Sequence, residues 1–75
     1  MYIMVIGCSE IGYHLTKALL ASNHEVVVVD KSRVRCDLLT EELGSVALQG
    51  DGTDQTVLRK AGAARAGLVV ASTDR

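Results

Sequence analysis

The feature that most constrains this chain is the regular alternation of short apolar runs with segments of helical periodicity. The runs at 2–6, 26–29, 46–48 and 68–71 are aliphatic, rich in β-branched residues and free of polar alternation. Strands of this kind are covered by helices on both faces, which is typical of parallel sheets. Because strand-helix-strand crossovers are almost always right-handed, the pattern predicts an α/β fold, a Rossmann-like half domain with strand order 3-2-1-4 and flanking helices.

Three helices are expected between the four strands. Apolar residues recur at helical spacing between the first two runs, which predicts an amphipathic helix packed on the sheet. Ser32 is expected to cap a second helix that Gly44 ends in the left-handed conformation. Thr53 and Gly62 are expected to bracket a third, shorter helix in the same way.

Composition limits the classes of partner. The chain has 48% hydrophobic and 23% charged residues, as soluble globular proteins do, and a net charge of -1 with interspersed signs. This balance argues against bulk attraction to nucleic acid or to an anionic membrane, so any ligand must be bound by local contacts. No apolar run approaches the roughly 20 residues of a membrane span, and the start of the chain lacks a signal-peptide pattern. A cytoplasmic chain is therefore expected.

The two cysteines carry no expected metal or redox site. Cys8 and Cys36 lack the spacing of a zinc or Cys-x-x-Cys motif, and nothing indicates a secreted context that favours a disulfide bond. Both are interpreted as buried free thiols.

The segment from Gly7 to Gly12 directly follows the first strand and opens the first helix. Gly7 permits a tight turn, Gly12 permits close packing of helix on strand, and free amides at the helix start favour a pyrophosphate. Ser9 stands where the dinucleotide-binding fingerprint has its middle glycine. Its Cβ is expected to obstruct the phosphate, although its hydroxyl can donate a hydrogen bond. The turn predicts a phosphate site that Ser9 weakens or shifts.

Asp30 ends the second strand, 18 positions beyond Gly12. This is close to the separation of about 20 expected for a carboxylate that binds an adenosine ribose, and a carboxylate there favours NAD over NADP. Lys31, Arg33 and Arg35 follow, and two interpretations stay open. They screen Asp30 or reach phosphates, or they form the solvated basic face of a helix start.

Two further segments follow strands. In 50–53, two glycines allow backbone near a ligand and Asp51 can accept a hydrogen bond from an adenine amino group, but a simple turn explains the segment equally well. Segment 71–74 brings small and hydroxylated residues to the end of the fourth strand. Lining a cofactor groove and capping a further helix are both open there.

Together these segments resemble the amino-terminal part of the Trk-type potassium-uptake regulator domain, also called the RCK or KTN domain. The resemblance rests on 7–12 with Asp30, on the segment LQGDGT at 48–53, and on 61–62 with the segment AGLVVASTD at 66–74. It spans essentially the whole chain. The Gly-Asp-Gly-Thr segment is more specific than the glycine turn alone.

The resemblance implies a cytoplasmic, non-enzymatic regulatory domain, peripheral at the inner face of the cell membrane. It implies binding of NAD or NADH, alternatively ATP, ADP or AMP, and assembly into a homo-oligomer, a dimer or higher. It further implies gating of a membrane potassium transporter or channel subunit, with no nucleic acid, catalytic residue or metal involved. By position, it assigns Gly7, Cys8, Ser9, Glu10, Ile11 and Gly12 to the phosphate turn, Asp30 and Lys31 to the ribose, Asp51 and Gly52 to the adenine side, and Thr73 to the far end.

Domains of this family continue with further strands, so residues 1–75 are interpreted as one nucleotide-binding Rossmann domain, truncated after its fourth strand. The run at 68–71 would then be an uncovered apolar edge, which favours pairing with another chain. Self-association is therefore expected.

The main alternative is the cofactor-binding fragment of an NAD- or FAD-dependent oxidoreductase, because the same half domain opens many such enzymes. His14 and His24 are candidate acid-base groups, but they fall on the first helix and at the amino end of the second strand, away from the site. Cys8 lies nearer, at a helix start that favours thiol reactivity, without an evident base. A scaffold that has lost its ligand is a third hypothesis, indicated by Ser9 alone.

Overall fold

The computed structural model describes residues 1–7 and 9–72. Along the chain, the elements are β1 (Tyr2–Ile6), α1 (Glu10–Ala21), β2 (Glu25–Asp30), α2 (Arg33–Leu43), β3 (Val46–Gln49), α3 (Gln55–Lys60), the short 3-10 helix η1 (Ala63–Arg65) and β4 (Leu68–Ala71). Each predicted strand is present within one residue of its expected bounds. The predicted alternation of strands and helices is confirmed.

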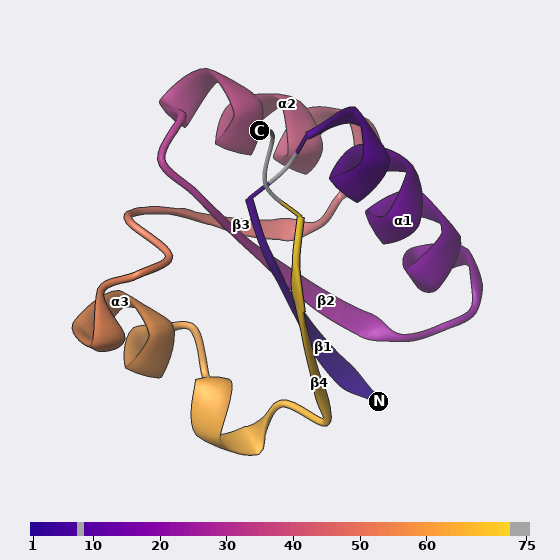
Figure 1. Cartoon of the computed structure of the whole chain (residues 1–75). Coiled ribbons are helices and arrows are strands. Elements are labelled where there is room, and N and C mark those ends of the chain that lie inside the picture. The colour runs from indigo at the N-terminus through magenta and orange to yellow at the C-terminus, as the bar shows by residue number, and fades with distance from the viewer. Residues whose placement is uncertain (8, 73–75) are drawn as a thin grey trace.

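The four strands form one parallel sheet in the order β3-β2-β1-β4 (Figure 1). In its register, Val5 of β1 lies between Val28 of β2 and Val70 of β4, and Val28 in turn pairs with Ala47 of β3. The predicted strand order is therefore confirmed. Because all four strands run the same way, their carboxyl ends meet at one edge of the sheet.

Each face of the sheet has its own apolar core, because successive residues of a strand point to opposite faces. Helices α1 and α2 cover one face, over a buried cluster that consists of Ile3, Val5, Val26, Val28 and Leu39. Helix α3 and η1 lie on the other face, over a buried cluster that consists of Met4, Val27, Val29 and Ala61 (Figure 1). The continuous apolar runs thus fill two cores at once.

The second helix begins and ends where its capping residues predict. The Arg35 amide donates to the Ser32 hydroxyl at 3.2 Å, which satisfies one of the free amides of the first turn. Gly44 ends the helix with a φ of 69°, in the left-handed region that a residue without a Cβ adopts readily.

Of the two residues expected to bracket the third helix, Gly62 is confirmed and Thr53 is wrong. Asp54 is the N-cap of this helix and accepts the Thr56 amide at 2.8 Å. Thr53 lies one position earlier, and its amide and hydroxyl both donate to Asp51. Helix α3 ends at Lys60 with Ala61 as its C-cap, and Gly62 follows in the left-handed conformation with a φ of 91°, where it is also the N-cap of η1.

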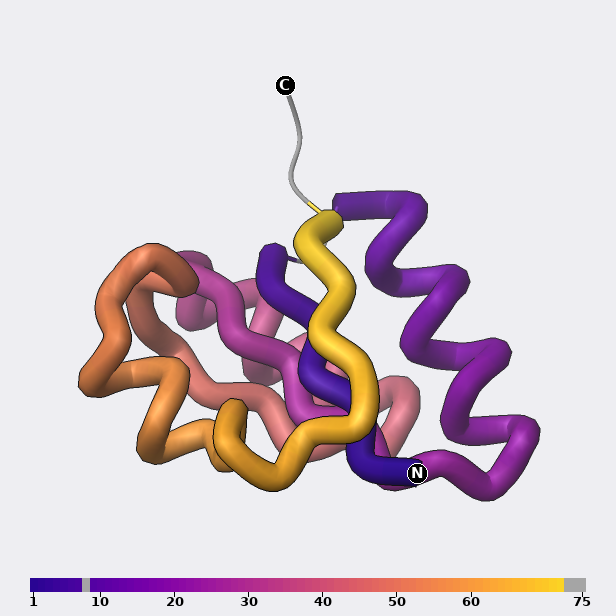
Figure 2. The backbone as a smooth tube through the Cα atoms, turned by 60° about the horizontal axis from the view of Figure 1, so that its bottom comes forward, coloured from indigo at the N-terminus to yellow at the C-terminus, as the bar shows by residue number. Residues whose placement is uncertain are grey.

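Strand β4 lies at an edge, with β1 as its neighbour in the described part of the sheet (Figure 2). Its residues Leu68 and Val69 are 47% and 48% exposed, so the predicted apolar edge is present among the described residues. None of the described helices is long and apolar enough to cross a membrane.

Candidate functional site

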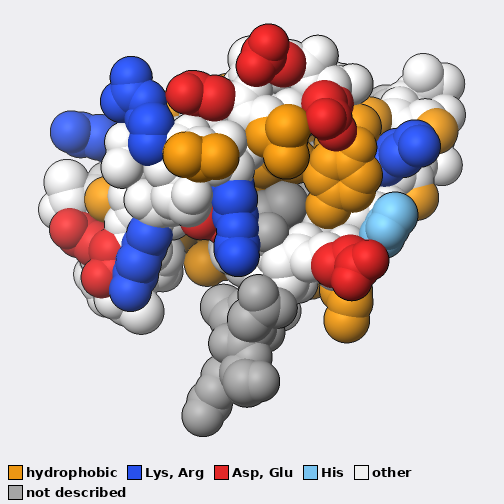
Figure 3. All heavy atoms as spheres, turned by 90° about the horizontal axis from the view of Figure 1, so that it is seen from above, with side chains coloured by type: hydrophobic (Ala, Val, Ile, Leu, Met, Phe, Trp, Pro, Cys, Tyr) orange, Lys and Arg blue, Asp and Glu red, His pale blue; other side chains and the backbone are white. Residues whose placement is uncertain are grey.

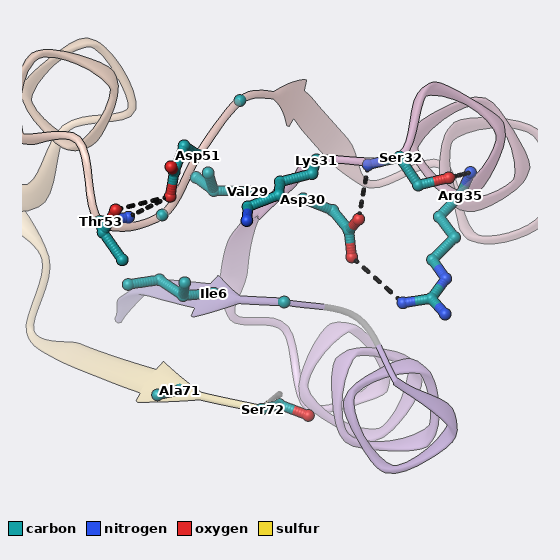
Figure 4. Close-up of a pocket in the computed structure, with 13 residues that line it drawn as sticks. Ile6, Val29, Asp30, Lys31, Ser32, Arg35, Asp51, Thr53, Ala71 and Ser72 are labelled. Carbon is teal, nitrogen blue, oxygen red and sulfur yellow. Dashed lines mark hydrogen bonds and ion pairs between the residues drawn. The ribbon is translucent and has the colours of Figure 1, made fainter. Parts of the chain in front are cut away.

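A groove of about 680 Å³ opens at the carboxyl ends of the strands (Figure 4). Its volume falls in the usual range of small-molecule sites, roughly 300 to 1,000 Å³. The residues that line it come from the ends of all four strands or the segments after them: Ile6, Gly7, Val29, Asp30, Lys31, Ser32, Arg35, Gly50, Asp51, Gly52, Thr53, Ala71 and Ser72. The fold alone therefore brings four separate chain segments to one cavity.

Backbone hydrogen bonds hold these segments together just beyond the strands. The Gly7 amide donates to the Val29 carbonyl at 2.7 Å, and the Gly50 amide donates to the Asp30 carbonyl at 2.9 Å. On the far side, the Ser72 amide donates to the Ile6 carbonyl at 2.7 Å. The segments that line the groove are therefore joined to one another by backbone hydrogen bonds just beyond the strands.

The turn after β1 uses its glycines as expected. Gly7 has a φ of 78°, which is accessible to glycine at low cost and confirms the tight turn. A Cβ on Gly12 would lie 2.7 Å from Ser72 Oγ and 3.1 Å from the Gly7 carbonyl oxygen, which confirms the predicted close packing of α1. The predicted site residue Cys8 lies outside the described residues, as does Thr73 after β4.

Ser9 turns its side chain toward the end of β4. It is the N-cap of α1, and its hydroxyl accepts the Gly12 amide at 3.3 Å. The same oxygen lies 3.0 Å from Ser72 Oγ, and both serines are buried. The backbone φ of Ser9 is -68°, so this position requires no glycine. Its hydroxyl is thus engaged within the protein, and Ser9 lies outside the lining of the groove.

Two predicted phosphate residues lie away from this groove. Ile11 is 76% exposed on the first turn of α1. Glu10 lines a second, smaller groove of about 350 Å³ between α1 and α2, together with Tyr13 and His14. The structure therefore brings Gly7 to the main groove but places Glu10 and Ile11 on the outer surface of α1.

Asp30 is the most deeply placed polar group in the groove, with 6% of the residue exposed. Its Oδ1 accepts the Ser32 amide at 2.8 Å, and its Oδ2 lies 3.7 Å from Arg35 Nη1 (Figure 4). Just behind it, Cys36 Sγ donates to the Asp30 carbonyl at 3.6 Å. Burial, with the Asp30 charge as a smaller cause, raises the pKa of the Cys36 thiol above its ordinary value. Cys36 is therefore the buried thiol that the sequence predicts.

The three basic residues after Asp30 separate into different environments. Arg33 pairs with Asp37 at 3.9 Å on the exposed surface of α2 and donates to Gln49 at 3.4 Å. Lys31 is exposed and lines the groove, and Arg35 lines both grooves. Arg35 thus lies where it can screen Asp30, whereas Arg33 belongs to the solvated face of α2.

Asp51 lies across the groove from Asp30 and is exposed. Its Oδ1 accepts the Thr53 amide at 2.8 Å and the Thr53 hydroxyl at 2.7 Å. These hydrogen bonds lower the pKa of the Asp51 carboxyl group below its ordinary value, and the bond from the Thr53 amide has the larger effect. The Lys31 charge adds a smaller effect in the same direction. A Cβ on Gly52 would collide with Cγ2 of Ile6, so this glycine allows the turn to approach β1.

The sequence did not single out the apolar floor of the groove. Ile6 and Val29 are the residues at or next to the ends of β1 and β2, and both line the cavity. Their position at the carboxyl ends of central strands is the signal that could have identified them.

The charged side chains of the described residues do not gather into a patch of one sign on this face of the molecule. In the view from above, Lys and Arg side chains are interspersed with Asp and Glu (Figure 3). Recognition of a charged ligand here depends on individual side chains such as Asp30 and Arg35.

The chain is similar to known proteins of one family. The TrkA-N domain model matches residues 3–75. A Trk system potassium uptake protein TrkA homolog of Archaeoglobus fulgidus is 40% identical over 73 residues, which cover 97% of this chain and 16% of that protein. The homolog of the same name from Pyrococcus abyssi is 32% identical over 75 residues, which cover all of this chain and 33% of that protein. The chain thus spans between about a sixth and a third of these relatives.

A solved structure agrees with the fold. The TrkA-N domain of the inner membrane protein ybaL from Escherichia coli superposes with a TM-score of 0.85 at 28% identity, over 93% of this chain and 51% of that one. The sheet, the turns at its carboxyl edge and the matched sequence all lead to the same assignment. This chain belongs to the TrkA-N domain family, whose fold is of the Rossmann type.

Proposed function

We propose that the main groove binds an adenine nucleotide, with NAD or NADH as the first candidates and ATP, ADP or AMP as alternatives. The observation that carries this proposal is the buried carboxylate of Asp30, which lines a groove beside the glycine turn of a Rossmann-type sheet. This is the position at which such sheets receive an adenosine ribose. The volume of the groove, about 680 Å³, suits a ligand of that size.

Each part of the nucleotide would have its own partners. Asp30 and Lys31 would hold the ribose, and the glycine turn with the first amides of α1 would face the phosphates. Asp51 and Gly52 would face the adenine. The roles of the other residues assigned from the family, Cys8, Ser9, Glu10, Ile11, Gly12 and Thr73, remain proposals of the same kind.

We further propose that the domain is regulatory and non-enzymatic and acts on potassium transport. The relatives that carry the name Trk system potassium uptake protein support a role of this kind. The proposed partner is a membrane potassium transporter or channel subunit, which the domain would contact from the cytoplasm at the inner face of the membrane. In keeping with a regulatory role, His14 is exposed on α1, and His24 precedes β2 at the opposite end of the sheet.

Regulation would act through paired domains. A nucleotide that spans the ends of β1, β2 and β3 can shift the arrangement of such a pair only by its differential affinity for two states. The half-exposed apolar side chains of Leu68 and Val69 on β4 support self-association. A chain that remains monomeric in sedimentation at high concentration would contradict this part of the proposal.

Calorimetry tests the nucleotide site directly. NAD, NADH, ATP, ADP and AMP are titrated into the parent chain, into Asp30→Ala and into Asp37→Ala. Asp37 is a matched control, because it is an exposed carboxylate on the outer surface of α2 that pairs with Arg33. We expect micromolar binding by the parent, weakened about 10- to 100-fold in Asp30→Ala, as for a lost charge-assisted hydrogen bond, and nearly unchanged in Asp37→Ala. Absence of binding by the parent would contradict the proposal.

A further inference from the structure

We propose that Arg35 determines specificity at the ribose, because it neutralises Asp30 and so allows the groove to accept an adenosine with a phosphate on its 2′ position as well as one without. This inference rests on the proposed nucleotide site and adds a ligand class to it. NADP and NADPH are the nucleotides that carry this group.

An isolated carboxylate at the end of the second strand repels a 2′-phosphate, whereas a nearby arginine accommodates it. Here both groups are present and paired, since Arg35 Nη1 lies 3.7 Å from Asp30 Oδ2. An aspartate at this position selects NAD over NADP when its negative charge is unpaired and exposed. Asp30 is buried and paired, so that selection does not apply here.

The charges of the described residues along this side of the groove are balanced. Two carboxylates among them, Asp30 and Asp51, face two basic side chains that also line the groove, Lys31 and Arg35. In Figure 4 the Lys31 side chain extends between the two aspartates. Arg33 does not take part, because it pairs with Asp37 and Gln49. A phosphate that enters beside Asp30 would thus meet two positive charges together with the negative ones.

The Asp30 and Arg35 side chains differ in exposure to solvent. The Asp30 side chain is 7% exposed and is also held by the Ser32 amide, whereas the Arg35 side chain is 49% exposed at the junction of two grooves. Arg35 can therefore turn toward a phosphate while Asp30 keeps its place. The planar guanidinium offers two parallel hydrogen bonds to phosphate oxygens, which an ammonium group does not.

The test compares the Kd values of NADH and NADPH for the parent, Arg35→Gln and Arg33→Gln. We expect the parent to distinguish the two nucleotides by less than about tenfold, and Arg35→Gln to raise the Kd of NADPH at least about tenfold more than that of NADH. Arg33→Gln is the matched control, a basic residue two positions away whose loss should change the ratio less than about threefold.

A charge-conserving variant separates this role from a structural one. Arg35→Lys keeps the positive charge but loses the two parallel hydrogen bonds of the guanidinium, so we expect it to raise the Kd of NADPH relative to that of NADH by less than Arg35→Gln does. If Arg35→Gln unfolds, Arg35→Lys alone decides: a rise of at least about threefold in the ratio of the NADPH Kd to the NADH Kd supports the inference, and a ratio equal to that of the parent overturns it.

Failure of the inference and failure of the nucleotide site give different results. Binding of NADH and NADPH that Arg35→Gln weakens equally, or not at all, overturns the specificity role and leaves the site in place. Rejection of NADPH by a parent chain that binds NADH does the same. A parent that binds neither nucleotide contradicts the proposed function, and the inference falls with it.

Discussion

The turns after β2 and β3 share one local structure and differ in everything around it. In each turn, an aspartate carboxylate accepts a hydrogen bond of 2.8 Å from the backbone amide two residues later. Asp30 accepts from Ser32, and Asp51 accepts from Thr53. Asp30 is buried and paired with Arg35, whereas Asp51 is exposed and its further partner is the Thr53 hydroxyl. A hydrogen bond to a charged group is worth more where water cannot replace it. The same turn therefore holds a buried, ion-paired carboxylate in one place and an exposed carboxylate in the other.

The largest expected effect concerns folding stability. Asp30→Ala leaves the Ser32 amide without its acceptor and Arg35 without its ion pair, in a site that is largely buried. We expect a loss of about 2–3 kcal/mol in the free energy of unfolding, measured with urea. Asp51→Ala should lose clearly less, because water can replace an exposed carboxylate. Equal losses would erase the proposed difference between the two turns.

The second effect tests how closely the turn after β3 approaches β1. Gly52→Ala places a Cβ against Cγ2 of Ile6, a branched side chain in the floor of the groove, so backbone or core must shift. We expect a cost of about 1–2 kcal/mol in thermal or urea unfolding. Gly67→Ala is the matched control, because its Cβ would meet the flexible side chain of Met1, which can move aside. A loss no greater than that of Gly67→Ala would show that the approach is not tight.

A smaller effect is expected from Ser9→Gly. The change removes a helix cap and the contact with Ser72, but it clears no space in the groove, because Ser9 lies outside its lining. We expect a stability loss of a few tenths of a kcal/mol, typical for glycine at an N-cap, and a change in nucleotide affinity below about threefold. Strong binding that appears only in Ser9→Gly would instead support a scaffold whose site this serine has closed.

The smallest effect is a pH dependence of stability at Asp51. Its folded-state pKa lies below the ordinary 3.8, so the carboxylate contributes stability that is present above pH 3.8 and is lost as the pH falls through the folded-state pKa. Acid unfolding profiles of the parent and of Asp51→Asn should therefore converge at the lowest pH. Parallel profiles over the whole acid range would contradict the hydrogen-bonded turn.

The sequence alone predicts the sheet well, because burial on both faces leaves a plain signature. Runs such as 26–29 carry no polar residue, and right-handed crossovers then limit the strand orders to a few, of which 3-2-1-4 is common. Short-range competition for hydrogen bonds is harder to predict. Thr53 and Asp54 are both good caps by residue type, and only the structure shows that the Thr53 hydroxyl contacts Asp51 while Asp54 caps α3.

Some residues of the candidate site can likewise be predicted from the sequence, and others cannot. Gly7, Asp30 and the turn at 50–53 follow from their place at strand ends, and they do line the groove. Glu10 and Ile11 were assigned by position in a family motif, and the geometry of the first turn of α1 instead places them outside it. Arg35, in contrast, lines the groove although no motif assigned it there. Only the fold shows that this arginine, and not Arg33, reaches Asp30.

The central claim is that a nucleotide binds at the carboxyl ends of β1, β2 and β3. An NMR titration of the nitrogen-15-labelled chain with NADH tests it most directly. We predict that the largest amide shifts cluster at Gly7, Ser32 and 50–53, which line the main groove. Shifts centred instead on Tyr13 and Leu38, in the groove between α1 and α2, or no shifts at saturating NADH, would contradict it.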